Sequence, residues 1–270
     1  MEKHQIENKT DFIMSMNDWT GHHQTKEWID YSVSIGYPYY EIQMLCLPED
    51  DQGQDEMIQY ALSKGLKINL HSHYAKNNII DTDEENCKKS ISQLKQTIDL
   101  SARHNLGVVT FHPGRLSSED ENTEEKWKQL LETVGHVAEY AKQKKVPIAI
   151  ENMERRKNEL VHTIDDLNRF ADFGKENPYF GVTLDFAHFA SHGIVSPELE
   201  RLKLPIFNVH ISQCTDETMH LPLTIENGKV DLVETCRVLK KHGYQSFVVL
   251  EIHEDFRESI DILSDAYNKE

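Results

Sequence analysis

Short apolar runs alternate along the whole chain with longer stretches in which apolar residues recur every three or four positions. The short runs are rich in β-branched and aromatic residues, as is typical of buried parallel strands. They predict strands at residues 12–16, 39–44, 66–70, 108–111, 146–150, 180–184, 206–209 and 247–250.

The stretches between these runs predict amphipathic helices, because their apolar residues fall on one helical face. The clearest helix covers residues 127–144, and Thr163 followed by Asp166 resembles a capping box that opens another. Further helices are predicted at 26–35, 86–103, 232–239 and 260–267. Glycine is expected to end a helix at Gly36, Gly65, Gly107 and Gly243.

The alternation of strands and helices predicts an α/β protein built as a single (β/α)8 TIM barrel. The chain of 270 residues has the usual length for one such barrel. Residues 1–270 are therefore expected to form one domain, with residues 1–10 disordered or loosely packed. The competing architecture is an open doubly wound sheet, which normally carries a Gly-rich phosphate-binding turn after its first strand. No such turn follows residues 12–16.

The chain is strongly acidic, with 46 Asp and Glu against 29 Lys and Arg and a formal net charge of −17. Such a surface repels nucleic acid phosphates unless a local basic cleft overrides it, and it disfavours anionic membranes. No run approaches the ~20 apolar residues of a membrane span, and residues 1–11 lack the apolar segment of a signal peptide. We therefore expect a cytoplasmic protein with a small-molecule substrate and no membrane partner. Nucleic acid is the weaker alternative, and homo-oligomerisation is left open.

The residues that directly follow the predicted strands are rich in His and acidic side chains. Six successive strands, from the third to the eighth, end in His71-Ser-His-Tyr74, His112, Glu151, Asp185-Phe-Ala-His188, His210 and Glu251. Because the carboxyl ends of barrel strands converge on one rim, these residues are expected to surround one pocket. Glu41, at the end of the second strand, is equally consistent with a place in that pocket and with a salt bridge at the rim.

A mixture of imidazoles and carboxylates around one pocket is a typical ligand set for a divalent metal. The mixture suits Zn²⁺, Mn²⁺, Fe²⁺ or Co²⁺ rather than Ca²⁺, which prefers oxygen ligands alone; Mg²⁺ is also kept open. A single His or Glu at a strand end is more often a structural residue. Six of them at equivalent positions predict a metal-dependent enzyme.

The same segments resemble the xylose isomerase-like TIM-barrel superfamily, which contains sugar and sugar phosphate isomerases and epimerases as well as endonuclease IV-type AP endonucleases. The most specific segments are residues 111–114, 150–152, 184–188 and 209–210, followed by Glu251. The likeness covers nearly the whole chain. For the isomerase and epimerase branch, the resemblance implies a single metal held by Glu151, Asp185, His210 and Glu251.

In the endonuclease branch this centre is one of three zinc sites. The resemblance then implies a second metal at His71, His112 and the shared Glu151, and it matches His188 and His220 to the third site. The Asp that the third site requires falls on Thr218, so this ligand set is incomplete. Ketose 3-epimerases place a substrate-binding Arg close to the position of Asp216, which argues against that particular activity.

The resemblance implies a divalent-metal-dependent isomerase or epimerase of a sugar or sugar-phosphate-like substrate, acting by proton transfer through an enediolate. Glu151 and Glu251 would exchange the proton, and substrate would be bound by His188, His71, Tyr74 and His220. One alternative is an endonuclease IV-type zinc phosphodiesterase acting on abasic DNA, and a related lyase or dehydratase is another. The acidic rim loops at 48–51 and 118–121 favour the small-molecule enzyme, because a duplex-binding rim is rich in Lys and Arg.

Overall fold

The structure is a computed structural model that describes residues 10–17, 25–156 and 158–269. The segment 1–10, which the sequence predicts to be disordered or loosely packed, lies outside these residues apart from Thr10. Within the described ranges, no helix combines the length and the apolar character needed to cross a membrane.

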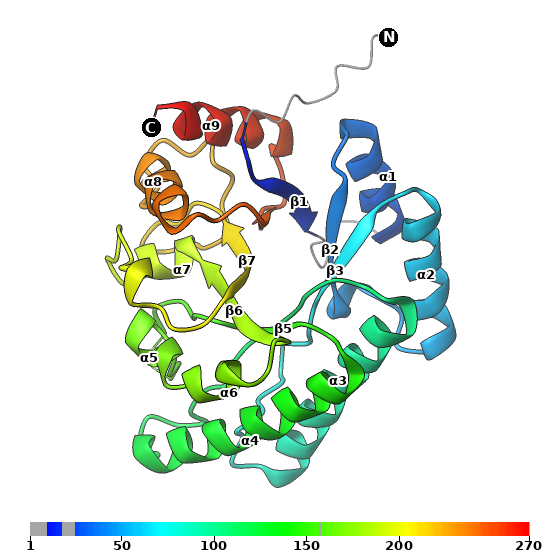
Figure 1. The fold of residues 1–270 in the computed structure, drawn as a ribbon, viewed down its shortest axis with the longest axis vertical. Coiled ribbons are helices and arrows are strands. Elements are labelled where there is room, and N and C mark those ends of the chain that lie inside the picture. The colour runs from blue at the N-terminus through cyan, green and yellow to red at the C-terminus, as the bar shows by residue number, and fades with distance from the viewer. Residues whose placement is uncertain (1–9, 18–24, 157, 270) are drawn as a thin grey trace.

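Eight parallel strands form a closed barrel in which neighbours follow the order of the chain, and β1 pairs with β8 to close it (Figure 1). The strands are β1 Ile13–Asn17, β2 Tyr39–Gln43, β3 Lys67–His71, β4 Val109–Phe111, β5 Ile148–Glu151, β6 Phe180–Asp185, β7 Ile206–Ile211 and β8 Phe247–Leu250. All eight lie on the runs that the hydrophobic pattern predicts. The predicted (β/α)8 barrel is therefore confirmed.

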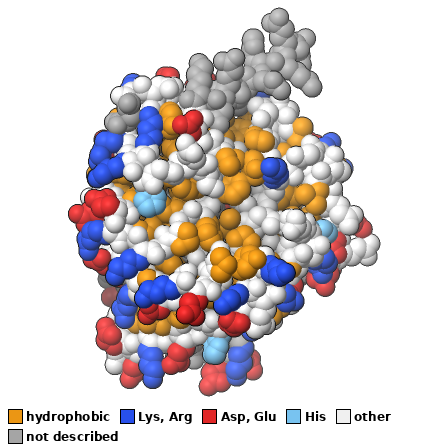
Figure 2. Space-filling model, in the orientation of Figure 1, with side chains coloured by type: hydrophobic (Ala, Val, Ile, Leu, Met, Phe, Trp, Pro, Cys, Tyr) orange, Lys and Arg blue, Asp and Glu red, His pale blue; other side chains and the backbone are white. Residues whose placement is uncertain are grey.

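Helices lie outside the strands and surround the barrel (Figure 1). They are α1 Thr25–Ile35, α2 Asp51–Ser63, α3 Glu84–His104, α4 Thr123–Lys144, α5 Ile164–Asn168, α6 Ala171–Lys175, α7 Phe186–Ser191, α8 Leu232–His242 and α9 Phe256–Asn268, with the 3-10 turns η1 Met44–Cys46 and η2 Leu199–Arg201. In α4, Leu130, Val134 and Val137 are fully buried, whereas Glu132 is exposed. Figure 2 shows hydrophobic side chains gathered in the middle of one face and charged side chains toward its edge.

The structure differs from the prediction after Thr163, where the sequence predicts one helix. The capping box is present, because Thr163 Oγ1 accepts from Asp166 N at 3.2 Å and Asp166 Oδ2 accepts from Thr163 N at 2.9 Å. The helix nevertheless divides into α5 and α6 at Phe170, which leaves the helical conformation with φ −92° and ψ 0°. Its fully buried ring packs 5.9 Å from the ring of Trp127, so burial of Phe170 prevails over continuation of the helix.

Gly107 does not end α3, contrary to the prediction. The helix ends at Asn105 in the left-handed conformation, with φ 52°. Gly107 lies instead against β3, where a Cβ atom would come 2.1 Å from Asn69 Oδ1. The other three glycines have the positive φ that was expected, at Gly36, Gly65 and Gly243.

A network of buried polar side chains crosses the barrel below the carboxyl ends of the strands. Asn208 Nδ2 donates to Glu41 Oε2 at 2.8 Å and to Thr110 Oγ1 at 3.2 Å, and Thr110 Oγ1 lies 2.9 Å from Thr183 Oγ1. Because strand side chains alternate with a period of two, the next inward positions after Thr110, Thr183 and Asn208 are His112, Asp185 and His210. The barrel therefore directs its predicted site residues toward one mouth.

Candidate metal centre and active site

Four side chains from consecutive strands form the centre of the candidate site. Glu151 ends β5, Asp185 ends β6, His210 lies in β7 and Glu251 follows β8. Each offers one ligand atom, and these atoms all lie within 4.8 Å of one another. All four residues are buried. We call Glu151, Asp185, His210 and Glu251 the central ligand group.

The oxygen atoms of this group suit a cation. His210 Nδ1 lies 3.1 Å from Glu151 Oε1 and 3.0 Å from Glu251 Oε2. Among the described residues, Glu151 Oε2, Asp185 Oδ2 and Glu251 Oε2 are buried and take part in no hydrogen bond, although histidine nitrogens lie 3.0–3.9 Å from them. Buried carboxylate oxygens without hydrogen bonds are costly unless a ligand satisfies them. Three carboxylates and one imidazole at this spacing therefore fit a divalent metal ion.

The second oxygen of Asp185 is used by the protein. Asp185 Oδ1 accepts from the backbone N of His188 at 2.7 Å and so caps α7. Asn152 fixes the strand end from the other side, because its Nδ2 donates to Asp185 O at 3.0 Å and its Oδ1 accepts from Asp185 N at 2.9 Å. These contacts hold the carboxylate of Asp185 so that its Oδ2 faces the other three members of the central ligand group.

Neighbouring histidines keep the two glutamates of the central ligand group ionised. Burial would raise the pKa of Glu151, but His210, His112 and His71 hold it well below the usual range. The pKa of Glu251 is likewise lowered, because His220 and His210 outweigh its burial. Burial raises the pKa of Asp185 to about 6, against the opposing effect of His188. Both glutamates are thus ionised at neutral pH, the state needed of a metal ligand or a base.

Two histidines lie next to Oε2 of Glu151. His71 Nε2 lies 3.4 Å and His112 Nε2 3.2 Å from Glu151 Oε2. His71 Nδ1 contacts Ser72 O at 3.0 Å, which leaves Nε2 facing the carboxylate. His71, His112 and Glu151 thereby form a second group whose ligand atoms lie within 4.8 Å of one another.

A third group contains Asp185, His188 and His220. His188 Nδ1 contacts Asn152 O at 2.7 Å, and its Nε2 lies 3.9 Å from Asp185 Oδ2. Burial disfavours charge on His188, but the carboxylates of Asp185, Glu151 and Glu251 raise its pKa to about 9. Thr218, at the position of the missing Asp, donates its backbone N to Thr215 Oγ1 at 3.1 Å. The third group therefore forms without a carboxylate from position 218.

A cavity of about 480 Å³ opens above these groups. Its wall contains Tyr74, His112, His188, His220 and Glu251, so it is lined by residues of all three groups. Tyr74 Oη donates to Gln43 Oε1 at 3.3 Å, and its ring stacks on that of His112 with centroids 5.2 Å apart. The volume suits a small molecule in contact with the central ligand group.

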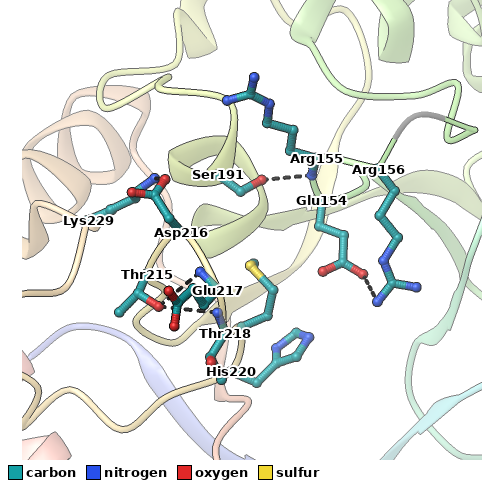
Figure 3. Close-up of a pocket in the computed structure, with 11 residues that line it drawn as sticks. Glu154, Arg155, Arg156, Ser191, Thr215, Asp216, Glu217, Thr218, His220 and Lys229 are labelled. Carbon is teal, nitrogen blue, oxygen red and sulfur yellow. Dashed lines mark hydrogen bonds and ion pairs between the residues drawn. The ribbon is translucent and has the colours of Figure 1, made fainter.

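A second cavity of about 540 Å³ shares Glu154, Arg156 and His220 with the first (Figure 3). Four of the charged groups in its wall form two ion pairs. Arg156 Nη2 lies 2.5 Å from Glu154 Oε1, and Lys229 pairs with Asp216. Figure 3 shows these pairs on opposite sides of the cavity. The two pairs reduce the charge that these four side chains can offer to a ligand.

The sequence interpretation missed the roles of two buried glutamates. Glu41 lies neither in the pocket nor at the rim; it is fully buried inside the barrel, with Oε1 3.0 Å from His210 Nε2. The sequence feature that indicates the buried placement of Glu41 is its position on the inward face of β2, two residues before the strand ends. Glu159 lines the cavity and is only 7% exposed. It stands in a polar loop, where no sequence signal separates it from a surface charge.

Comparison with known proteins agrees with this architecture. Residues 29–266 match the profile of the family described as xylose isomerase-like TIM barrel. An uncharacterized protein of Methanocaldococcus jannaschii is 25% identical over 162 residues, which cover 60% of this chain. The aligned region spans 58% of that protein, less than two thirds of its length.

Solved structures share the fold over nearly the full chain. A D-tagatose 3-epimerase-like protein superposes with a TM-score of 0.78 at 18% identity, covering 96% of this chain and 99% of its own. The 3-keto-D-glucoside 4-epimerase of E. coli gives a TM-score of 0.73 at 16% identity, covering 94% and 99%. Identities this low show a common fold alone. Because the family profile spans the barrel from α1 to α9, the chain belongs to the xylose isomerase-like TIM barrel family.

Proposed function

We propose that the protein is a divalent-metal-dependent isomerase or epimerase of a sugar or sugar-like small molecule. The observation that carries this proposal is the central ligand group at the base of a polar cavity of about 480 Å³. The fold is shared with proteins named as sugar epimerases, which supports the same reaction class.

Glu151, Asp185, His210 and Glu251 would hold the metal. When bound, a divalent cation supplies Lewis-acid polarisation of a substrate carbonyl and its neighbouring hydroxyl. The cavity wall would position the substrate over this group. Oxygen and imidazole ligands together leave Mn²⁺, Co²⁺, Zn²⁺, Fe²⁺ and Mg²⁺ as candidates.

Glu151 and Glu251 would transfer the proton. They come from β5 and β8 and lie on either side of His210 Nδ1, at 3.1 and 3.0 Å. The lowered pKa values leave both carboxylates ionised in the absence of substrate, and one of them would accept the proton from the carbon beside the carbonyl. The other carboxyl, carrying a proton taken from solvent, would return that proton to the opposite face of the enediolate and so complete an epimerisation, after which each carboxyl group exchanges its proton with water. General acid–base catalysis of this kind contributes about 10²–10⁴-fold.

The surrounding polar side chains would bind substrate oxygens. The pKa of His188, raised to about 9 by Asp185, Glu151 and Glu251 despite burial, keeps its ring protonated as a hydrogen-bond donor. His220 and Tyr74 line the same cavity, and the ring of His71 lies 5.4 Å from that of Tyr74. A polyhydroxylated substrate matches this set of donors and acceptors.

Two measurements test the proposal together. Elemental mass spectrometry on untagged protein purified without chelators should find about one Mn, Co or Mg per chain. Incubation of the loaded enzyme with ketoses and aldoses in D₂O should give a product that carries deuterium at the epimerised carbon. A protein that binds no metal, or a sugar panel without deuterium incorporation, would contradict the proposal.

A zinc-dependent phosphodiesterase is a second candidate, favoured by one specific observation. The three ligand groups share Glu151 and Asp185, so two or three zinc ions would have adjoining ligand sets. Several metal ions together can activate water and stabilise a leaving oxygen. The net charge of −17 opposes binding to DNA. Two or three Zn per chain together with cleavage of abasic DNA would favour this candidate over the isomerase.

A further inference from the structure

The second cavity adjoins the first beside the central ligand group. Glu154, Arg156 and His220 line both cavities, so these three residues stand at the boundary between them. His220 Nδ1 lies 3.6 Å from Glu251 Oε2, and the His220 ring lies 5.4 Å from that of His188. His220 has a φ of 57°, a conformation that is uncommon for residues other than glycine. His220 therefore faces both the central ligand group and the second cavity.

Hydrogen bonds fix both walls of the second cavity (Figure 3). One wall belongs to the loop after β7, which is closed by an antiparallel bridge between Gln213 and Leu221. Inside this loop, Thr215 Oγ1 accepts from two backbone N–H groups, at 3.2 and 3.1 Å. On the other wall, Ser191 Oγ accepts from Arg155 N at 2.8 Å. The second cavity is thus a pre-formed site, as is usual for small-molecule binding.

The lining of the second cavity is polar and balanced in charge. Three basic and three acidic side chains line it, namely Arg155, Arg156, Lys229, Glu154, Asp216 and Glu217. Ser191, Thr215 and Thr218 add hydroxyl groups, and Met219 is the one apolar residue among the described residues of the lining. An anion would meet three carboxylates, a cation would meet three basic groups, and an apolar group would leave polar atoms unsatisfied. A neutral group rich in hydroxyls matches this lining, because each hydroxyl both donates and accepts.

We propose that the second cavity is a binding subsite for a second, neutral sugar unit, so that the substrate is a disaccharide or another glycoside. The inference rests on the proposed function and deepens it. The unit that reacts lies at the central ligand group in the first cavity, and the unit joined to it occupies the second. The ion pair between Arg156 Nη2 and Glu154 Oε1, at 2.5 Å, stands at the boundary where the two units are joined. Its carboxylate accepts from a sugar hydroxyl, and its guanidinium donates to a sugar oxygen.

The test compares sugars with and without a second unit. Wild type loaded with metal is assayed with ketohexoses and aldohexoses in three forms: free, with a glucosyl group on one hydroxyl, and with a phosphate on the terminal hydroxyl. Thr218→Trp brings a large ring into the second cavity from a residue that does not line the first. Thr218→Ser is the conservative variant. Thr123→Trp, at the exposed first residue of α4, is the matched control.

For at least one linkage, kcat/KM of the wild type should be about tenfold or more higher for the glucosylated sugar than for the free sugar. This is the effect of one or two added hydrogen bonds to charged groups. In Thr218→Trp the ratio of the two kcat/KM values should fall toward one, whereas Thr218→Ser and Thr123→Trp should keep it. Because the ratio compares two substrates on the same protein, a partly misfolded preparation does not change it.

The results that would overturn the inference are distinguishable from failure of the proposed function. If the wild type turns over free sugars at least as well as every glucosylated form, the second cavity binds no sugar unit, although the proposed function stands. A preference for the terminal phosphates over both neutral forms also contradicts the inference. A high ratio that persists in Thr218→Trp would place the second unit outside this cavity. If no sugar reacts, free or glucosylated, the proposed function fails and the inference fails with it.

Discussion

Glu41 Oε1 lies 3.0 Å from Nε2 of His210, on the opposite side of the imidazole ring from Glu151 and Glu251. Glu41 reaches His210 from β2 across the barrel interior, where both side chains are fully buried. Asn208 Nδ2 donates to the other oxygen of Glu41 at 2.8 Å and holds the carboxylate in place. A carboxylate behind a metal-ligating His fixes the ring orientation and raises its basicity. Glu41 thus directs Nδ1 of His210 toward the central ligand group.

Glu41→Gln is expected to weaken metal binding by about 10–100-fold, because the second nitrogen of His210 loses its carboxylate partner. The affinity can be measured by calorimetric titration of chelator-treated protein with Mn²⁺ or Zn²⁺. Glu132→Gln removes an exposed carboxylate from α4 and should leave the affinity unchanged. Equal affinities for Glu41→Gln and the wild type would show that Glu41 does not position His210.

Removal of metal is expected to lower the thermal stability of the protein. Without a cation, the buried carboxylates of Glu151, Asp185 and Glu251 are held together with only histidines to offset their charge. Metal at about 100 times its Kd should stabilise the folded state by about 2.7 kcal/mol. Calorimetric scans with and without EDTA measure the difference. In His210→Ala the metal-dependent part of the shift should be lost; a full shift in that variant would place the bound metal elsewhere.

His112→Ala separates the two candidate functions by metal stoichiometry. His112 contacts Glu151 Oε2 at 3.2 Å but does not belong to the central ligand group. If that group alone holds metal, the variant should keep about one metal ion per chain and raise KM for the sugar. Loss of about one zinc ion from a protein that holds two or three would instead support the phosphodiesterase.

The sequence predicts the barrel and the residues of the ligand groups because both depend on periodic positions. Buried parallel strands need apolar runs, and the carboxyl ends of the strands meet at one rim of the barrel regardless of the conformation of the loops. The sequence does not decide between the pocket and the rim for Glu41, since its place depends on where Asn208 and His210 lie across the barrel. Glu159 could not be assigned at all, because its burial depends on how the loop after β5 folds against Arg115. Likewise, the break between α5 and α6 follows from the tertiary burial of Phe170. The helical spacing of apolar residues in the sequence does not predict this burial.

The pH dependence of stability should reveal the buried carboxyl of Glu159. Its pKa is raised by burial from the ordinary 4.5 to about 7, so the folded state binds this proton more tightly than the unfolded state. The stabilisation from that proton is fully present below about pH 4.5 and is lost as the pH rises through 7. A shift of this size corresponds to about 3 kcal/mol. Glu159→Gln has no such proton to lose. The free energy of unfolding of this variant should therefore rise relative to that of the wild type between pH 4.5 and 8. Urea unfolding of both proteins in EDTA across this range measures the difference, and two curves that stay parallel would show that Glu159 ionises normally in the folded protein.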